Sequence, residues 1–191
     1  FLDLNLNDWQ NLRGKEIAMI FQDTGNMLNP VRTIGYQFIE YIKVHSKLSK
    51  KDALNFSKQM LKKMNLQNVE NILKSYPFEL SGGQCQRIGI AMAMTFKPKL
   101  LLADEPTSAL DANTQAQIVQ ELLKLHDEYK TTILMITHNL AVANYMADRI
   151  LIMKDGEIID FVDKNKLFNS KNEYTKELIN SIPNLKGKRY V

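Results

Sequence analysis

The most informative run of the 191-residue chain is Leu100-Leu101-Leu102-Ala103-Asp104-Glu105-Pro106. Its apolar part predicts a strand buried in a sheet, and the strand ends abruptly in two carboxylates. Acidic side chains have no packing role there, whereas one carboxylate can hold Mg²⁺ through water and its neighbour can orient an attacking water. The run therefore predicts that Asp104 and Glu105 are a pair of metal holder and general base. Two solvated turn residues before a proline are the alternative interpretation.

Three other short apolar runs also predict buried strands, and helical periodicity separates the later ones. We expect strands at 17–21, 132–137 and 150–153, and helices at 114–129 and 140–147. Strands that alternate with helices are typical of a mainly parallel α/β sheet. Asp155-Gly156 predicts a hairpin turn after the last of these strands.

Polar side chains follow these strands where they end. Gln22 follows the run at 17–21, Asp104 and Glu105 follow the run at 100–103, and His138 follows the run at 132–137. Ligands of open α/β sheets bind at the edge formed by the carboxyl ends of the strands. We therefore expect these four side chains to meet at one edge of the sheet.

The segment 33–96 has a different pattern, with apolar positions every three to four residues, for example Phe38, Ile42, Leu61 and Met64. This periodicity predicts helices only, inserted between the strands. After about residue 163 a polar linker precedes a short amphipathic helix at 172–182, closed by Pro183.

Composition sets broad limits on the protein. Hydrophobic residues make up 45% of the chain and charged residues 24%, which is ordinary for a globular domain. The net charge of +4 is small for a nucleic-acid-binding domain, and the single cysteine, Cys85, excludes an internal disulfide. No apolar run approaches the roughly 18 residues of a membrane-spanning helix, so membrane association is expected through a partner.

A second motif, Leu80-Ser81-Gly82-Gly83-Gln84, opens one of the predicted helices. Two glycines at a helix start let a ligand approach the backbone closely, and the amide groups and the helix dipole favour an anion. The motif therefore predicts a phosphate contact. A glycine-containing turn capped by Ser81 is the alternative.

Taken together, these motifs resemble the nucleotide-binding subunit of ABC transporters, over nearly the whole chain. The matching segments, in family order, are Gln22 (Q-loop), Leu80 to Gln84 (signature), Leu100 to Glu105 (Walker B), Ser108-Ala109-Leu110-Asp111 (D-loop) and His138 (switch histidine). The resemblance implies a P-loop NTPase core of the ABC ATPase type, mainly parallel in its sheet, with an inserted helical subdomain and an incomplete N-terminal side.

The resemblance also implies a role for each of these residues. Glu105 would be the general base, Asp104 would hold Mg²⁺, Gln22 would sense the metal and the attacking water, and His138 would contact the γ-phosphate of ATP. Ser81, Gly82, Gly83 and Gln84 would bind the nucleotide across a head-to-tail interface between two subunits, and Asp111 would link the two sites.

The implied division of the chain has four parts. They are an ATPase core with the Q-loop (1–30), a helical subdomain that ends in the signature helix (31–96), a core with Walker B, the D-loop and the switch histidine (97–162), and a C-terminal linker and helix (163–191). The implied partners are a second ABC ATPase subunit, the same or different, transmembrane permease subunits and, indirectly, a solute-binding protein outside the cell. No nucleic acid is expected. The subunit would lie at the cytoplasmic face of the membrane, where the loop after Gln22 and the helical subdomain would meet the permease.

Within the family, the chain is similar to the branch that serves oligopeptide, dipeptide and nickel importers. The similarity rests on Phe21-Gln22-Asp23 followed by Leu28-Asn29-Pro30, and on Tyr174-Thr175 with Leu178 and Pro183. Thr24 stands where that branch commonly has proline, and Asn172-Glu173 replaces its usual His-Pro. Similarity to this branch implies that the cargo is a peptide or a nickel complex.

The chain departs from the family pattern at one essential motif. It has no G-x-x-x-x-G-K-[ST] string, whose amides and lysine cradle phosphates. Gly14-Lys15 precedes Glu16 and lacks the spaced glycine. We expect that the chain is truncated at its N-terminus, that it neither binds ATP tightly nor hydrolyses it alone, and that it tends to aggregate. Two other interpretations stay open, a soluble ABC ATPase without a membrane partner and a non-catalytic relic.

Overall fold

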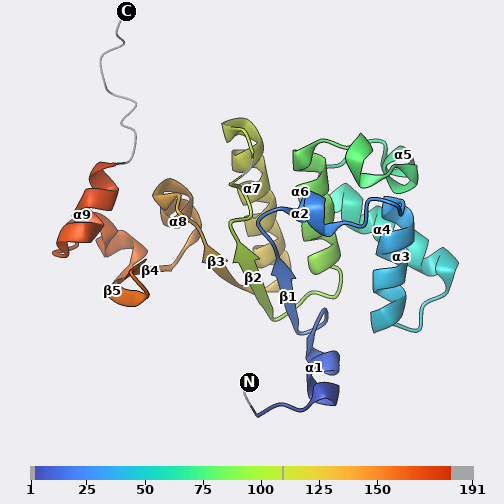
Figure 1. The fold of residues 1–191 in the computed structure, drawn as a ribbon, viewed down its shortest axis with the longest axis horizontal. Coiled ribbons are helices and arrows are strands. Elements are labelled where there is room, and N and C mark those ends of the chain that lie inside the picture. Colours follow the sequence, from blue (N-terminus) through green and yellow to red (C-terminus); the bar gives the residue numbers. More distant parts are fainter. Residues whose placement is uncertain (1–2, 109, 182–191) are drawn as a thin grey trace, which may run out of the picture. The chain divides into compact units, whose positions relative to one another are not determined.

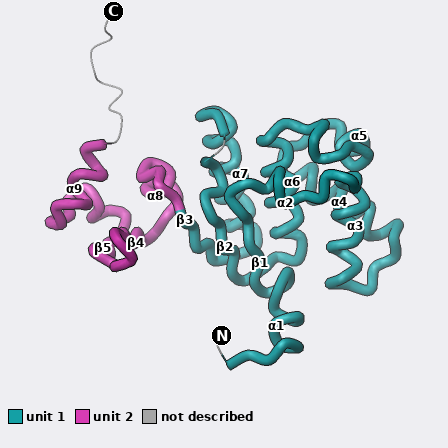
Figure 2. Tube along the Cα trace, viewed as in Figure 1, with its two compact units in different colours: residues 1–136 teal, residues 137–191 magenta. Residues whose placement is uncertain are grey.

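The computed structural model describes residues 3–108 and 110–181, and the chain divides into two compact units, 1–136 and 137–191 (Figure 2). Ala109 of the predicted D-loop, and Ile182 and Pro183 of the predicted C-terminal helix end, lie outside the described residues. None of the helices in the described residues combines the length and apolarity needed to cross a lipid bilayer.

The first unit contains a three-stranded parallel sheet. Its strands are β1 (Ile17–Ile20), β2 (Leu100–Asp104) and β3 (Thr132–Ile136), in the order β1-β2-β3 (Figure 1). Ile20 pairs with Ala103, and Asp104 pairs with Ile136. The carboxyl ends of the three strands therefore lie at one edge, as the sequence predicts.

The two faces of this sheet differ in burial. Ala18, Ile20 and Leu101 are at most 6% exposed, whereas Leu134 and Ile136 of β3 are 59% and 63% exposed. The expectation that residues 132–137 form a fully buried strand is therefore wrong for one face of β3. The physical reason is that, within the first unit, the helices that pack on the sheet lie against its other face.

Two helices lie behind the strands in Figure 1 and form the covered side of the sheet. They are α6 (Gly82–Ala93) and α7 (Ala112–Tyr129). Ile88 of α6 and Ile118 and Leu122 of α7 are completely buried. The buried residues of α7 recur at helical spacing, so that helix buries one stripe and leaves its other side to solvent, whereas Gly82 is the only exposed residue of α6.

The segment between β1 and β2 is helical, as expected from its periodicity. Its helices before α6 are α2 (Thr24–Met27), α3 (Ile34–His45), α4 (Lys50–Lys63), α5 (Val69–Lys74) and the 3₁₀ helix η1 (Pro77–Glu79), and α1 (Leu6–Leu12) precedes β1. Phe38, Ile42, Leu61 and Met64 are all fully buried. The apolar residues that predict the helices are thus the core that packs them together.

The second unit contains a hairpin and three short helical segments. These are α8 (Leu140–Met146), β4 (Arg149–Lys154), β5 (Glu157–Asp163), the 3₁₀ helix η2 (Lys164–Asn169) and α9 (Glu173–Asn180). Asp155 and Gly156 make the turn with φ of 50° and 83°, which confirms the predicted hairpin. The expectation that 150–153 joins the parallel sheet is wrong, since β4 and β5 form a separate antiparallel sheet. Ile150, Ile152 and Leu167 form the core of this unit.

Candidate functional site

The predicted base lies in a constrained turn at the end of β2. Glu105 has a backbone φ of 43°, in the left-handed region that residues other than glycine seldom adopt. Its N–H donates to the carbonyl of Ile136 at 2.9 Å, and its own carbonyl accepts from the N–H and the hydroxyl of Ser108, each at 3.2 Å. Strained backbone of this kind is concentrated at functional sites. Asp104 and Glu105 are both half-buried at the carboxyl edge of the sheet.

Gln22 follows β1 at the same edge and is exposed. The next residue, Asp23, caps α2 by accepting from the N–H and the side chain of Asn26 at 3.2 and 2.6 Å. Thr24 is then buried against the signature helix, where a Cβ added at Gly89 would lie 2.2 Å from its methyl group. The segment after Gln22 is therefore packed directly onto α6.

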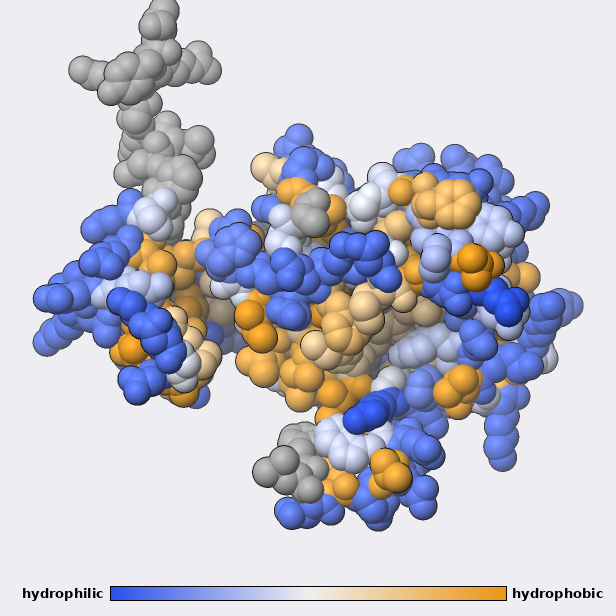
Figure 3. All heavy atoms as spheres, viewed as in Figure 1, coloured by the Kyte–Doolittle hydropathy of each residue, from blue (hydrophilic) through white to orange (hydrophobic). Residues whose placement is uncertain are grey.

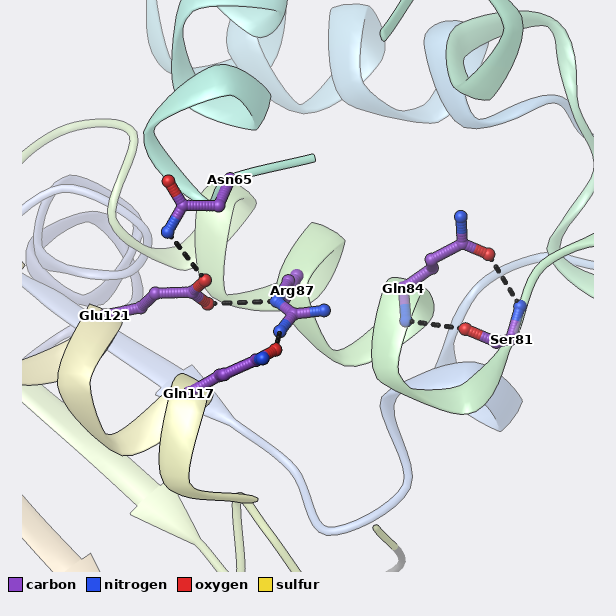
Figure 4. Close-up of polar contacts among 6 residues, drawn as sticks. All are labelled: Asn65, Ser81, Gln84, Arg87, Gln117 and Glu121. Carbon is purple, nitrogen blue, oxygen red and sulfur yellow. Dashed lines mark hydrogen bonds and ion pairs between the residues drawn. The ribbon is translucent and has the colours of Figure 1, made fainter. Parts of the chain in front are cut away.

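The predicted signature forms the first turn of α6. The Ser81 hydroxyl accepts from the N–H of Gln84 at 3.3 Å, and the Gln84 side chain accepts from the N–H of Ser81 at 2.9 Å (Figure 4). This reciprocal capping box fixes the helix start. Ser81 and Gly82 are exposed. The first N–H groups of an α-helix have no partner within the helix, so this turn can present Gly82 and Gly83 amides to an anion.

Asp111 of the predicted D-loop caps α7. Its carboxylate accepts from the hydroxyl of Thr114 at 2.6 Å and from the N–H groups of Thr114 and Asn113 at 3.0 and 3.1 Å. These hydrogen bonds, that of the Thr114 hydroxyl above all, hold the pKa of Asp111 below its ordinary value of 3.8. The loop before it is also held, because the Gln115 side chain donates to the carbonyls of Thr107 and Leu110 at 2.8 and 3.1 Å.

The signature and the D-loop are in contact. A Cβ added at Gly83 would lie 2.8 Å from the Thr114 methyl carbon, and one added at Gly82 would lie 3.9 Å from a methyl carbon of Leu110. Any side chain larger than hydrogen at position 83 would therefore push the starts of α6 and α7 apart. The structure thus brings two of the sequence-predicted motifs together within the first unit.

His138 belongs to the second unit. It is exposed and lies just before Asn139, whose side chain caps α8 by accepting from the N–H groups of Ala141 and Val142. His138 lines a cavity of about 520 Å³ together with Tyr174 and Leu178 of α9. Its expected meeting with Gln22 and Glu105 stays a prediction.

One polar cluster was missed by the reasoning from sequence. Arg87 of α6 donates to Glu121 and Gln117 of α7 at 3.0 and 2.6 Å, and the Asn65 side chain donates to Glu121 at 2.9 Å (Figure 4). Glu121 lies among the apolar positions Ile118 and Leu122 of its helix. A charged residue on an apolar stripe is the signal that could have identified the cluster, since a buried charge needs a partner.

The donor set at the sheet edge fits Mg²⁺ bound together with phosphates. Among the described residues there is no group of three or more His, Cys, Asp or Glu that could enclose a metal ion. Mg²⁺ does not need such a cage, because it keeps several waters and is commonly held by one or two carboxylates plus substrate phosphates. The Asp104 carboxylate at the end of β2 can supply that contact.

Comparison with protein families gives a match to the model described as "ABC transporter" over residues 2–108, more than half of the chain. The chain is 41% identical over 182 residues to the oligopeptide transport ATP-binding protein AppD of Bacillus subtilis, and 39% identical over 182 residues to the glutathione import ATP-binding protein GsiA of Escherichia coli K12. Each alignment covers 95% of this chain, but 56% of AppD and 29% of GsiA. The chain therefore spans only about half or less of the length of these relatives.

A solved structure titled as the dimeric post-hydrolysis state of the ATP-binding cassette MJ0796 bound to ADP and Pi superimposes with a TM-score of 0.75. The two chains are 31% identical, and the match covers 85% of this chain and 68% of the other. The expected α/β fold of the ABC ATPase type is confirmed, and so is the resemblance to ATP-binding proteins of the peptide importer branch.

Proposed function

Because the chain belongs to the ABC transporter family, we propose that it forms the greater part of an ATP-hydrolysing subunit that powers a membrane importer. The observation that carries the proposal is the turn at the end of β2. There the strand delivers Asp104 and Glu105 to the carboxyl edge of the sheet, and Glu105 is held in a strained backbone conformation by hydrogen bonds to Ile136 and Ser108. A carboxylate on a fixed backbone, next to a metal-holding carboxylate, is suited to in-line attack by water on a phosphate.

Each residue of the edge has a proposed task. Glu105 accepts a proton from the attacking water, and Gln22, exposed after β1, orients that water. Asp104 holds Mg²⁺, which would neutralise charge on the ATP phosphates when bound. His138 donates to the terminal phosphate, which requires the second unit to bring it to the edge.

The signature acts on a second nucleotide in this proposal. Ser81, Gly82, Gly83 and Gln84 contact the phosphates of an ATP held by a partner subunit, while Asp111 links the two sites. Three observations support this. The first turn of α6 is exposed and can present amides to an anion. The D-loop is its neighbour, since a Cβ added at Gly82 would lie 3.9 Å from a methyl carbon of Leu110. The solved structure of MJ0796 that this chain resembles is also a dimer.

A membrane permease is the proposed partner of the loop after Gln22 and the helical segment. Exposed apolar side chains occur there, with Met27 and Val31 at 59% and 75% and Phe78 at 73%. The start of α3 is tied to the segment before Phe78, because the N–H of Ile34 donates to the carbonyl of Ser75 at 2.9 Å. These side chains offer an apolar surface of the kind that marks protein contacts. The subunit would then lie at the cytoplasmic face of the membrane.

The proposed cargo is a peptide. The names of AppD and GsiA, which refer to oligopeptide and glutathione transport, support this choice. A nickel complex is the second candidate cargo, by resemblance to the same branch. Import of either would involve a solute-binding protein that contacts the permease rather than this chain.

Hydrolysis also requires a phosphate loop, and the 191 residues contain no G-x-x-x-x-G-K-[ST] string. We therefore propose that the chain hydrolyses ATP only within a full-length parent that supplies this loop. The purified 191-residue chain should show no Mg²⁺-dependent ATP hydrolysis. Activity from this chain that disappears in Glu105→Gln would contradict the proposal.

The test of the function itself uses the full-length parent. Its ATP hydrolysis should require Mg²⁺, and Glu105→Gln should lower kcat by about 10²- to 10⁴-fold, because the water loses its general base. Glu157→Gln is the matched control, since Glu157 is an exposed carboxylate of the β4–β5 hairpin. Equal activity of the Glu105→Gln protein and the wild type would contradict the assignment. Co-purification with a polytopic membrane protein tests the transporter role separately.

A further inference from the structure

Arg87 spans one turn of the neighbouring helix. Its Nε donates to Glu121 Oε2 at 3.0 Å, and one terminal nitrogen donates to Gln117 Oε1 at 2.6 Å (Figure 4). Gln117 and Glu121 are four residues apart on α7 and therefore lie on the same side of that helix. Two bonds from one planar guanidinium to acceptors one turn apart restrict both the sliding of α6 along α7 and its rotation.

The carboxylate of Glu121, at the centre of this cluster, is buried, and both of its oxygens accept hydrogen bonds. The Glu121 side chain is 6% exposed and that of Arg87 is 14% exposed. The second oxygen of Glu121 accepts from the Asn65 side chain, at 2.9 Å, and Asn65 follows the end of α4 with a φ of 52°. The cluster thus joins the α4–α5 loop, α6 and α7. Because a buried charge without partners is costly, the three segments are held in one arrangement.

This cluster and the signature are mechanically connected. At their starts, α6 and α7 touch through Gly83 and Thr114, and the Thr114 hydroxyl donates to Asp111. Further along, the same two helices are joined by Arg87 and Glu121. A change in the second contact would therefore alter how α6 lies on α7, and with it the position of Gly83 relative to Asp111.

We propose that Arg87, paired with Glu121 and braced by Gln117 and Asn65, is a positioning residue that sets the signature turn relative to the D-loop. This inference rests on the proposed function. The guanidinium acts through α6 and makes no contact with nucleotide. Its task is to hold the amides of Gly82 and Gly83 where the phosphate of an ATP in the partner subunit arrives.

The proposal separates two measurable quantities. In the proposed function, a subunit binds ATP through its own phosphate loop before the two subunits close, and its signature is used only after closure. Loosening α6 on α7 should therefore lower kcat and leave the Kd for nucleotide of the open subunit unchanged. A purely structural role would instead lower kcat, raise the Kd and lower the melting temperature together.

The experiment uses the full-length parent and compares Arg87→Ala, Arg87→Lys, Glu121→Gln and the reversed pair Arg87→Glu with Glu121→Arg. Turnover is measured with Mg-ATP, and Kd with a fluorescent ATP analogue at low protein concentration. Arg87→Ala should lower kcat by about 10- to 100-fold, the size expected for a misplacement near 1 Å. Arg87→Lys should also lower kcat, by a smaller factor, because an ammonium keeps the charge but cannot reproduce the two bonds of the planar guanidinium.

The reversed pair should recover most of kcat, since the side-chain amides of Gln117 and Asn65 can exchange donor and acceptor by turning over. Such recovery also excludes a direct contact between Arg87 and phosphate, because a glutamate at that position could not replace it. Gln120→Ala is the matched control. Gln120 lines the same surface hollow as Arg87 and is exposed, and it makes none of the hydrogen bonds of the cluster.

The outcomes are distinct. A wild-type parent that does not hydrolyse ATP contradicts the proposed function and the inference with it. A wild type that hydrolyses ATP beside an equally active Arg87→Ala protein overturns the inference alone. Parallel losses of kcat and nucleotide affinity in Arg87→Lys and Glu121→Gln also overturn it. If the reversed pair fails to fold, these two milder variants decide, and reduced kcat with unchanged Kd supports the proposal.

Discussion

The two faces of the parallel sheet carry similar apolar side chains but differ in what covers them. On one face Ile20 and Leu101 are 2% and 0% exposed. On the other, Met19, Leu134 and Ile136 are 43%, 59% and 63% exposed, and Figure 3 shows hydrophobic surface over the strands. An apolar strand pattern therefore specifies that a strand can be buried on both faces. The pattern does not show whether other residues of this chain cover both faces.

The largest effect expected from this difference is on stability. Leu101→Ala should lower the free energy of unfolding by about 2–5 kcal/mol, because it opens a cavity in a completely buried position. Leu134→Ala removes the same atoms from a largely exposed position and should cost less than about 1 kcal/mol. Denaturant unfolding of both variants measures the two values. Similar losses would show that the exposed face is covered in solution.

A second, smaller effect concerns the helix layer that covers the buried face. Gly83→Ala places a Cβ 2.8 Å from the Thr114 methyl, so it should destabilise the α6–α7 contact by about 1 kcal/mol after the gain in helix propensity. Gly82→Ala meets nothing nearer than 3.9 Å and should be neutral or slightly stabilising. Thermal melting distinguishes the two.

Thr114→Ser sharpens this test. It removes the clashing methyl and keeps the hydroxyl that donates to Asp111. The double variant of Gly83→Ala with Thr114→Ser should therefore melt close to the wild type. A double variant as unstable as Gly83→Ala would show that the contact does not explain the loss.

The smallest effect is a dependence of stability on pH through the cap of α7. Hydrogen bonds from Thr114 depress the pKa of Asp111 in the folded chain. Because the folded-state pKa lies below the unfolded value near 3.8, the stabilisation is present above that pH and is lost as the pH falls through the folded-state pKa. Asp111→Asn should flatten the acid side of the stability curve. If the free energy of unfolding of this variant falls with acid as steeply as that of the wild type, other carboxyl groups cause the dependence and the prediction is wrong.

Local features of the fold followed from the sequence because they depend on near neighbours. The strand at 17–20, the helix capped by Ser81 and the hairpin at Asp155-Gly156 each rest on periodicity, a cap or a turn within a few residues. The general rule that the carboxyl ends of parallel strands share one edge predicts Gln22, Asp104 and Glu105 there, and β1, β2 and β3 do pair in parallel. The family resemblance then supplied roles that no local pattern contains.

The remaining features depend on contacts between distant segments. Arg87 pairs with Glu121, 34 residues away, and Asn65 reaches Glu121 across 56 residues. A periodic pattern in the sequence predicts neither of these pairings. The burial of only one face of β3 and the pairing of β4 with β5 likewise depend on which elements pack together. Helical spacing can mark Glu121 as anomalous, but it cannot name its partner.

The most direct test of the account asks whether His138 joins Gln22 and Glu105 beside one terminal phosphate. The measurement is NMR of the full-length parent with ¹⁵N-labelled histidine, in which Mn-ATP replaces Mg-ATP. The unpaired electrons of Mn²⁺ broaden the resonances of imidazole groups that lie near the metal. The chain supplies its own references, since His45 and His126 are its other histidines. The account predicts that the His138 resonance, assigned by its loss in His138→Gln, broadens while those of His45 and His126 persist. A His138 resonance left sharp when Mn-ATP is bound would contradict it.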